Sequence, residues 1–248
     1  ASDNVLRTDV SNRDENGLLQ PNAHFSTIYE YEILDQRTRM CQQRGSALLT
    51  NADLSCASMP AAESVTTEYG YDANRNQLLT RYGEATRGAD PFNTVTTLYD
   101  ERDLPFRSVR AAGGPNQSTD QMDYDGNGNV RSTSQGLESA PRVRTYAYDG
   151  YDRRTAATDP MGNVATSRYD ANGNVVSERV DGELLDLAGS AGNLRLSETN
   201  YQYDAMDRRI RRDTAHFDTQ PPQPPIGDGS STTQWTYADN SQATSQSD

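Results

Sequence analysis

The feature that most constrains this sequence is a Tyr-Asp pair, followed by turn-forming residues, that recurs along the chain. Six clear copies begin at Tyr71, Tyr99, Tyr124, Tyr148, Tyr169 and Tyr203. The first five are spaced by 28, 25, 24 and 21 residues, and the sixth follows after 34. Weaker copies begin at Tyr31 and Tyr237. Such spacing is typical of proteins that stack one small structural unit many times.

Each copy predicts a β-hairpin. Before the Tyr-Asp pair, aromatic residues alternate, as at Tyr146 and Tyr148, and this period of two is the signature of a strand. The aspartate favours a turn, because its side chain accepts hydrogen bonds from the backbone just ahead. Asn-Gly at 127–128 and 172–173 suits the positive φ of tight hairpin turns. A second strand then follows, as at 175–180.

The sequence therefore predicts an all-β protein in which repeated antiparallel hairpins form a continuous curved or spiralling sheet. A single hairpin is only marginally stable, whereas stacked hairpins bury a shared face. The end strands of such a sheet expose backbone groups unless something covers them. The residues that define the repeat are Tyr71, Asp72, Tyr99, Asp100, Tyr124, Asp125, Tyr148, Asp149, Tyr169, Asp170, Tyr203 and Asp204.

Three regions are expected. Residues 1–28 form an N-terminal arm or edge segment, loosely ordered up to residue 22. Residues 29–240 form the repeat domain, and 241–248 form a tail. Loop insertions are expected near 184–196, with a short helical turn as an option, and near 218–230, where the proline-rich stretch favours an exposed stiff loop over an SH3-type ligand.

The composition is polar and acidic, with a formal net charge of -13 and a hydrophobic fraction of 33%. Disorder would fit these values, but the 14 tyrosines favour an ordered sheet, because tyrosine buries area and has a high β-propensity. The acidity disfavours nucleic acid and anionic membranes as partners. All 23 basic residues are arginine, which excludes a P-loop lysine or a Schiff base in this sequence.

Cys41 and Cys56 flank a short loop segment. A disulfide between them is favoured over two free thiols, and it implies an oxidising compartment. No run is apolar enough for a membrane span. The start at Ala1 fits a mature end after signal removal or a fragment boundary. A secreted or extracellular location is therefore expected.

The sequence offers no recognisable catalytic or cofactor site. The two histidines, His24 and His216, accompany neither a G-x-S-x-G element nor a cysteine at a suggestive spacing. No zinc-binding pattern is present. The segments 125–129 and 170–174 place oxygen ligands at alternate positions, as a calcium loop does, but their glycine spacing departs from an EF-hand loop, and turn formation explains these residues. No catalytic, cofactor-binding or metal-binding residue is predicted.

Paired arginines occur at 153–154, 208–209 and 211–212. An anion-binding stripe is one interpretation. Charge pairs across strands with Asp152, Asp207 and Asp213 are the favoured one.

The segments YDANGNVVSERVDG, at 169–182, and YDGYDRRTAATDPMGNVATSRYDANGN, at 148–174, resemble the YD repeats of the RHS superfamily. The resemblance runs from about Tyr69 to Asp239. It implies a long β-sheet that spirals into a hollow shell. In bacterial polymorphic toxins and insecticidal toxin complexes the shell encloses a C-terminal toxin domain, and in teneurin-like adhesion proteins the repeat forms an extracellular barrel.

The sequence departs from that family in two ways. Asp159-Pro160-Met161-Gly162 resembles the family's DPxG element but is followed by Asn163 and by further repeats, with no cleavage block or toxin domain. The chain is also too short to close a large cavity. We therefore expect a piece of a longer protein, a small stand-alone repeat protein, or a subunit completed by its neighbours.

Two functions follow from these expectations. The first is a non-catalytic segment of a shell that encapsulates a toxin or other cargo polypeptide. The alternative is a secreted assembly or adhesion module that polymerises through its edge strands into fibres or binds a surface ligand. The expected partners are proteins: an enclosed cargo, a neighbouring shell segment or identical subunits.

Overall fold

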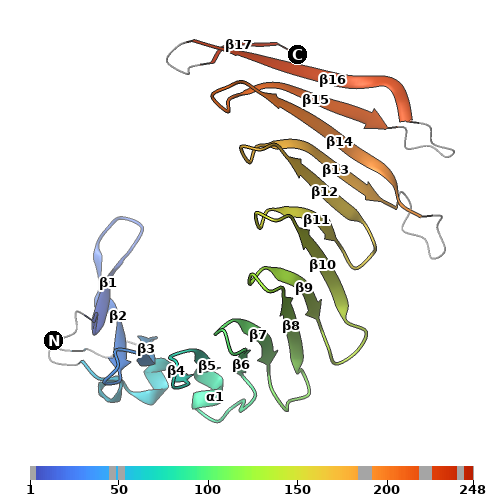
Figure 1. Cartoon of the computed structure of the whole chain (residues 1–248). Coiled ribbons are helices and arrows are strands. Elements are labelled where there is room, and N and C mark those ends of the chain that lie inside the picture. Colours follow the sequence, from blue (N-terminus) through green and yellow to red (C-terminus); the bar gives the residue numbers. More distant parts are fainter. Residues whose placement is uncertain are drawn as a thin grey trace. The chain divides into compact units, whose positions relative to one another are not determined.

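The structure is a computed structural model that describes residues 4–44, 49, 54–183, 192–217, 225–238 and 243–247 (Figure 1). The prediction of an all-β fold built from antiparallel hairpins is confirmed, since the described residues form a 17-stranded sheet. Its strands are β1 Arg7–Arg13, β2 Leu19–Tyr31, β3 Arg37–Gln43, β4 Ser64–Tyr71, β5 Gln77–Arg81, β6 Thr94–Tyr99, β7 Pro105–Arg110, β8 Ser118–Tyr124, β9 Val130–Gln135, β10 Arg142–Tyr148, β11 Arg154–Thr158, β12 Val164–Tyr169, β13 Val175–Gly182, β14 Leu194–Tyr203, β15 Arg209–Phe217, β16 Pro225–Tyr237 and β17 Ala243–Ser247. Three short helices are described: η1 Cys56–Ser58, η2 Ala61–Glu63 and α1 Gly83–Thr86.

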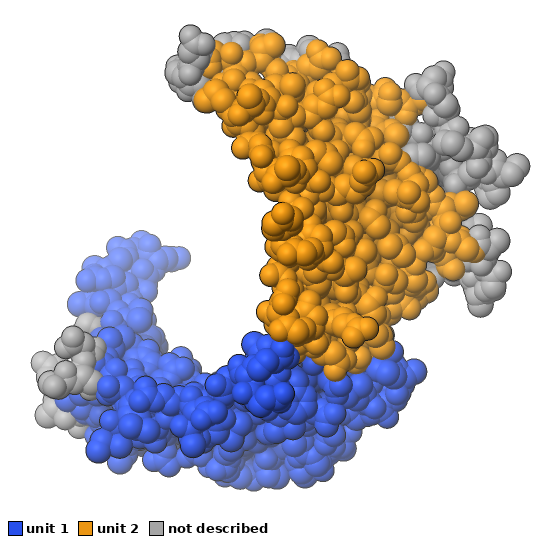
Figure 2. All heavy atoms as spheres, in the orientation of Figure 1, with its two compact units in different colours: residues 1–122, 135–141 blue, residues 123–134, 142–248 orange. Residues whose placement is uncertain are grey.

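The chain divides into two compact units (Figure 2). Unit 1 comprises residues 1–122 and 135–141, and unit 2 comprises residues 123–134 and 142–248. In unit 1, each of the strands β1 to β7 pairs antiparallel with the next strand in sequence. The strands β10 to β17 of unit 2 follow the same rule.

Few of the described side chains are fully buried. The buried apolar side chains among the described residues are Ile28, Cys41, Met59 and Ala85, all in unit 1. Ile28, Cys41 and Met59 pack together, with Leu49 and Cys56 beside them. Because buried apolar area is so small, the strand ladders and the polar contacts between hairpins must carry much of the stability.

Several segments differ from the sequence-based expectations. The N-terminal arm contains β1 and the start of β2, and the tail contains β17, so neither is structureless where it is described. Residues 225–230, which the sequence predicts to be part of a loop insertion, lie in β16. Residues 184–191 and 218–224, which hold most of the expected insertions, lie outside the described residues. β1 lacks the alternating apolar side chains that indicate a strand, so the sequence does not predict it.

None of the described helices has the length and apolar character needed to cross a bilayer.

Candidate functional site

The turns that follow the repeat tyrosines share one geometry, which the turn at Asp170 illustrates. The carboxylate oxygen Oδ1 of Asp170 accepts from the backbone N–H of Asn172 at 3.0 Å and from that of Asn174 at 2.8 Å. The side-chain amide of Asn174 donates to Oδ2 of the same carboxylate at 3.0 Å. The backbone N–H of Asp170 donates to the carbonyl of Asn174 at 3.0 Å, closing the loop. The aspartate therefore organises the turn, as the sequence predicted.

Counted from the residue that follows the repeat tyrosine, the fourth residue of each described turn has a positive φ. Glycine fills this position in two of the repeat turns, Gly128 and Gly173, where it adopts this conformation without strain. Aspartate fills it at Asp35 (63°), Asp103 (60°), Asp152 (59°) and Asp207 (59°), and arginine at Arg75 (73°). Aspartate tolerates the left-handed region better than most residues. It also has a second role here, in contacts between turns.

Hydrogen bonds lower the pKa of the turn aspartates. For Asp170 the side-chain amide of Asn174 is the main cause, and it outweighs the opposing effect of partial burial. For Asp149 and Asp204 the guanidinium groups of Arg153 and Arg208 play that part and lower the pKa in the same direction. These carboxylates are consequently held in the ionised form that the turn needs.

The repeat tyrosines connect each hairpin to the one before it. The hydroxyl of Tyr203 donates to the carbonyl of Val175 at 2.9 Å, and Val175 lies six residues after Tyr169. The same offset of six applies to every bond of this type between described hairpins: Tyr71 to Arg37, Tyr99 to Gln77, Tyr148 to Val130, Tyr169 to Arg154 and Tyr237 to Arg209. Each acceptor is the first residue of the strand that leaves the preceding turn.

A second set of contacts joins the turns themselves, and it reveals two kinds of turn. In donor turns, asparagine occupies the third and fifth positions, as at Asn172 and Asn174. In acceptor turns, aspartate occupies the fourth position, as at Asp207. The amides of Asn172 and Asn174 donate to Oδ1 of Asp207 at 2.9 and 2.7 Å. The same pattern recurs from Asn127 and Asn129 to Asp152, and from Asn74 and Asn76 to Asp103.

Donor and acceptor turns alternate along the chain. The turns after Tyr71, Tyr124 and Tyr169 are donor turns, and those after Tyr31, Tyr99, Tyr148 and Tyr203 are acceptor turns. Every donor–acceptor link described above lies within one of the two compact units. The structural repeat is therefore a pair of hairpins, twice as long as the repeat that the Tyr-Asp motif defines.

Two arginines of acceptor turns also contact the next repeat along the chain. Arg153 pairs with Asp149 of its own turn at 2.6 Å, and it donates to the carbonyl of Asp170 at 3.0 Å. Its guanidinium also lies 4.6 Å from the ring centroid of Tyr169. Arg208 pairs with Asp204 of its own turn at 2.7 Å, and its guanidinium lies 4.7 Å from the ring centroid of Tyr237.

The predicted arginine partners therefore need correction. Arg153 and Arg208 pair with the first aspartate of their turn, and Asp152 and Asp207 instead accept from asparagine amides. Arg211 pairs with Asp213, which lies two residues along the same strand. Cross-strand pairs do occur elsewhere, at Arg39 and Glu68 and at Arg195 and Asp181.

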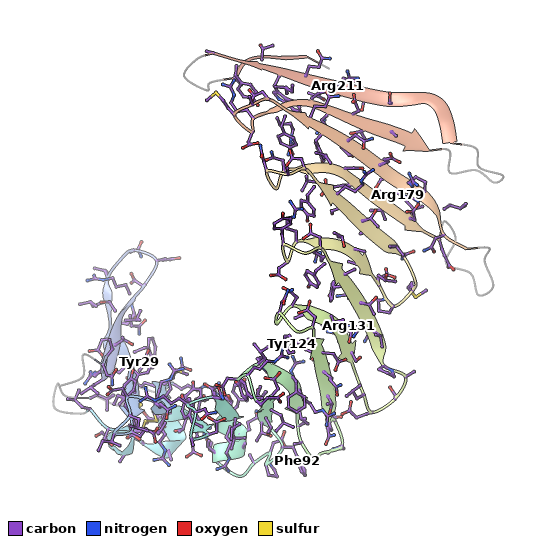
Figure 3. The ribbon with its side chains drawn as sticks, viewed as in Figure 1. Tyr29, Phe92, Tyr124, Arg131, Arg179 and Arg211 are labelled. Carbon is purple, nitrogen blue, oxygen red and sulfur yellow. A yellow bond between two sulfur atoms is a disulfide. The ribbon has the colours of Figure 1, made fainter. Side chains whose placement is uncertain are left out.

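Outside the turns, most of the described residues are partly or fully exposed. Figure 3 shows side chains projecting from both faces of the strands, with Arg131, Arg179 and Arg211 among them. One hollow in unit 1 is lined by Phe92, Val95 and Pro115. Glu138 accepts from the hydroxyl and the backbone N–H of Thr119 and from the amide of Gln117, and these bonds lower its pKa to about 2. This network fastens the loop after β9 to β8.

The described residues contain no group of three or more histidine, cysteine, aspartate or glutamate side chains suited to hold a metal ion. In the segments considered for calcium, Asp125 and Asp170 already accept bonds from their own turns. The side chains of His24 and His216 lie outside the described part of the structure. Cys41 and Cys56 form a disulfide with their Cα atoms 5.5 Å apart, and it ties η1 to β3.

The sequence analysis missed the carbonyl acceptors of the tyrosines and the role of Asp103, Asp152 and Asp207. The sequence does contain a signal for the contacts between turns. Turns with asparagine at the third and fifth positions have Gly or Arg at the fourth, and the turns between them have Asp at the fourth. Because turn formation alone explains each of these residues, the alternation is apparent only when successive turns are compared.

The chain thus repeats a Tyr-Asp turn, with a tyrosine hydroxyl linking each hairpin to the one before it. Residues 148–183 match the protein family described as RHS Repeat. The resemblance of the chain to the RHS superfamily is thereby confirmed. No curated protein sequence matches the chain.

Two solved structures share the fold. One is the crystal structure of TcdB2-TccC3-Cdc42, with 19% identity and a TM-score of 0.57 over 90% of this chain. The other is the Tc holotoxin pore of Photorhabdus luminescens, with 17% identity and a TM-score of 0.58 over 97% of this chain. The chain spans 11% and 12% of the lengths of those two proteins. At this level of identity the likeness concerns the fold.

Proposed function

We propose that this chain is a non-catalytic structural segment of an RHS-type shell that encloses a toxin or other cargo polypeptide outside the cytoplasm. The observation that carries the proposal is the ladder of Tyr-Asp turns. In it, hydrogen bonds from tyrosine hydroxyls and asparagine side-chain amides join each hairpin to its neighbours. Such a ladder builds a wall of any length without a thick apolar core. The fold that the chain shares with components of Tc toxin structures supports the same role.

The disulfide supports a location outside the cytoplasm, since such bonds persist in oxidising compartments. Protein partners are proposed on the same grounds: an enclosed cargo, adjoining shell segments, or both.

Protection from protease tests enclosure. The complete polypeptide that contains this segment is purified and digested with proteinase K, with and without prior unfolding in urea. We expect a cargo fragment that survives in the native sample and is degraded after unfolding. Equal degradation of all non-repeat sequence in both samples would contradict enclosure. If instead the chain forms fibres whose length grows with protein concentration, the assembly function is the correct one.

A further inference from the structure

Asparagine followed by glycine occurs three times in the sequence, at 16–17, 127–128 and 172–173. Each pair lies in a turn, the asparagine is exposed, and the glycine has a positive φ, of 79°, 89° and 94° in chain order. Such pairs are chemically reactive, because glycine has no side chain to hinder attack by its backbone nitrogen on the preceding asparagine.

The reaction is deamidation, and it consumes only water. The glycine nitrogen loses its proton to base and bonds to Cγ of the asparagine, while the bond from Cγ to Nδ2 breaks and ammonia leaves. Water then opens the resulting succinimide ring at either carbonyl, which gives aspartate or isoaspartate. Nothing is oxidised or reduced, and a neutral amide becomes a carboxylate.

The turn at Asp14, which joins β1 to β2, has the backbone geometry of the Tyr-Asp turns (Figure 1). Oδ1 of Asp14 accepts from the backbone N–H of Asn16 and from that of Leu18, each at 2.9 Å. The backbone N–H of Gly17 donates to the carbonyl of Asp14 at 2.9 Å, and Gly173 makes the same bond in its own turn at 3.2 Å. The backbone therefore gives these pairs similar access to the reaction.

The asparagine side chains differ in what they bind. Asn172 donates to Oδ1 of Asp207 at 2.9 Å, and Asn127 donates to Oδ1 of Asp152 at 2.8 Å. Within the described residues, the side chain of Asn16 makes no such bond to another turn. In the reaction Cγ must approach the backbone nitrogen of the next residue and Nδ2 must leave, so a bond from Nδ2 to an acceptor aspartate has to break.

We propose that Asn16 is a site of spontaneous deamidation and isoaspartate formation, and that Asp152 and Asp207 protect Asn127 and Asn172 from the same reaction. The expected protection is about tenfold in rate, which corresponds to about 1.4 kcal/mol and agrees with the loss of one hydrogen bond to a charged group.

The protection preserves the links between turns. Deamidation of Asn172 would set a carboxylate beside that of Asp207, so that the hydrogen bond between the turns would be replaced by repulsion. The donor turn after Tyr71 resists the reaction for a different reason. Arg75 stands there in the place of glycine, and its side chain hinders attack on Asn74.

Peptide mapping by mass spectrometry tests the proposal. The chain is incubated at physiological temperature and mildly alkaline pH, and replacement of each amide by a carboxylate is followed with time. We expect Asn16 to react about tenfold faster than Asn127 and Asn172, and Asn74 to stay intact. In urea, where the turns are lost, the three Asn-Gly pairs should react at similar rates.

Two variants test the protection directly. Asp207→Gly removes one acceptor and keeps a residue that tolerates a φ of 59°. Asn172 should then react about tenfold faster, while Asn127, which lies in the same compact unit, keeps its rate and is the internal control. Asp152→Gly should give the reverse result, with Asn127 accelerated and Asn172 unchanged.

Three results would overturn the inference. The first is equal rates at Asn16 and Asn172 in the unmodified chain, a comparison that needs no variant to fold. The second is an unchanged rate at Asn172 in Asp207→Gly. The third is equal acceleration of Asn127 and Asn172 in that variant, which would assign the protection to the folding of unit 2 and not to the acceptor. None of these results bears on the protease test for enclosure.

Discussion

The hydroxyl of Tyr203 donates to the backbone carbonyl of Val175 at 2.9 Å, across two hairpins whose tyrosines lie 34 residues apart in sequence. The same bond joins hairpins whose tyrosines lie 28 residues apart (Tyr71 and Tyr99) or 24 residues apart (Tyr124 and Tyr148), so the connector between hairpins varies in length while the contact does not. The tyrosine therefore fixes the position of each hairpin relative to the preceding one, whatever the length of the connector between them.

Removing that hydroxyl should weaken unit 2. Tyr203→Phe keeps the ring and leaves the Val175 carbonyl without this donor. We expect a loss of about 1 kcal/mol in the free energy of unfolding, seen as a fall in Tm of about 2–4 °C. Tyr151→Phe is the matched control, because Tyr151 is 82% exposed and should tolerate the change. Equal Tm values for the two variants would contradict the role given to the hydroxyl.

The link between donor and acceptor turns can be measured by a double-mutant cycle. Asn172→Ala removes one donor to Asp207, and Asp207→Gly removes the acceptor while keeping a residue that tolerates a φ of 59°. We expect a coupling energy of about 0.5–1 kcal/mol from urea unfolding of the two single variants and the double variant. Strictly additive effects would show that the two turns do not support each other.

Acid should destabilise the ladder. The pKa values of Asp149, Asp170 and Asp204 are lowered in the folded state by hydrogen bonds from Arg153, Asn174 and Arg208. A carboxylate whose pKa is lower in the folded state than in the unfolded state stabilises the protein at pH values above its unfolded pKa of about 3.9. That contribution is lost as the pH falls through the folded-state pKa. We therefore expect the Tm to be flat near neutrality and to fall below about pH 5.

Asp170→Asn identifies the origin of that fall. The variant should be less stable at pH 7 and should lose less stability on acidification than the unmodified protein. Glu101→Gln, which removes the charge of an exposed carboxylate in an acceptor turn, controls for net charge. A Tm profile for Asp170→Asn that parallels the unmodified protein at every pH would refute the assignment.

The disulfide should stabilise unit 1. Cys41 and Cys56 are separated by 15 residues, and closure of a loop of that length stabilises a protein by about 3 kcal/mol in the chain-entropy model. Cys41→Ser with Cys56→Ser should expose β3 and β2 to faster amide exchange and leave β13 to β15 unchanged. Reducing agent should have no further effect on the double variant. Alkylation of the unmodified protein without reductant would show that the bond is absent.

Much of the fold could be predicted from the sequence because the information is local. The aspartate, the positive-φ residue and the residue that closes each turn lie within five positions, so one copy such as 170–174 specifies its own hairpin. The sheet follows when such hairpins are placed in series. β1 was harder, because Arg7–Arg13 has a polar strand pattern that composition assigns to a loose arm.

The contacts between hairpins could not be predicted in the same way. Asn172 and Asp207 are 35 residues apart, and each is by itself an ordinary turn residue. The arginine partners were wrong for a related reason. Asp152 precedes Arg153 in sequence, but closing the turn brings Asp149 to the guanidinium, and a positive φ directs Asp152 toward the neighbouring turn.

The alternation of donor and acceptor turns limits how such a protein can change in evolution. Deleting a donor hairpin would set two acceptor turns side by side, so that an aspartate equivalent to Asp152 or Asp207 would lose its amide donors. Deleting an acceptor hairpin would instead set two donor turns side by side and leave asparagine amides without their acceptor. Gains and losses of two hairpins keep the order intact. The length of the wall should therefore vary among descendants of this sequence in steps of four strands.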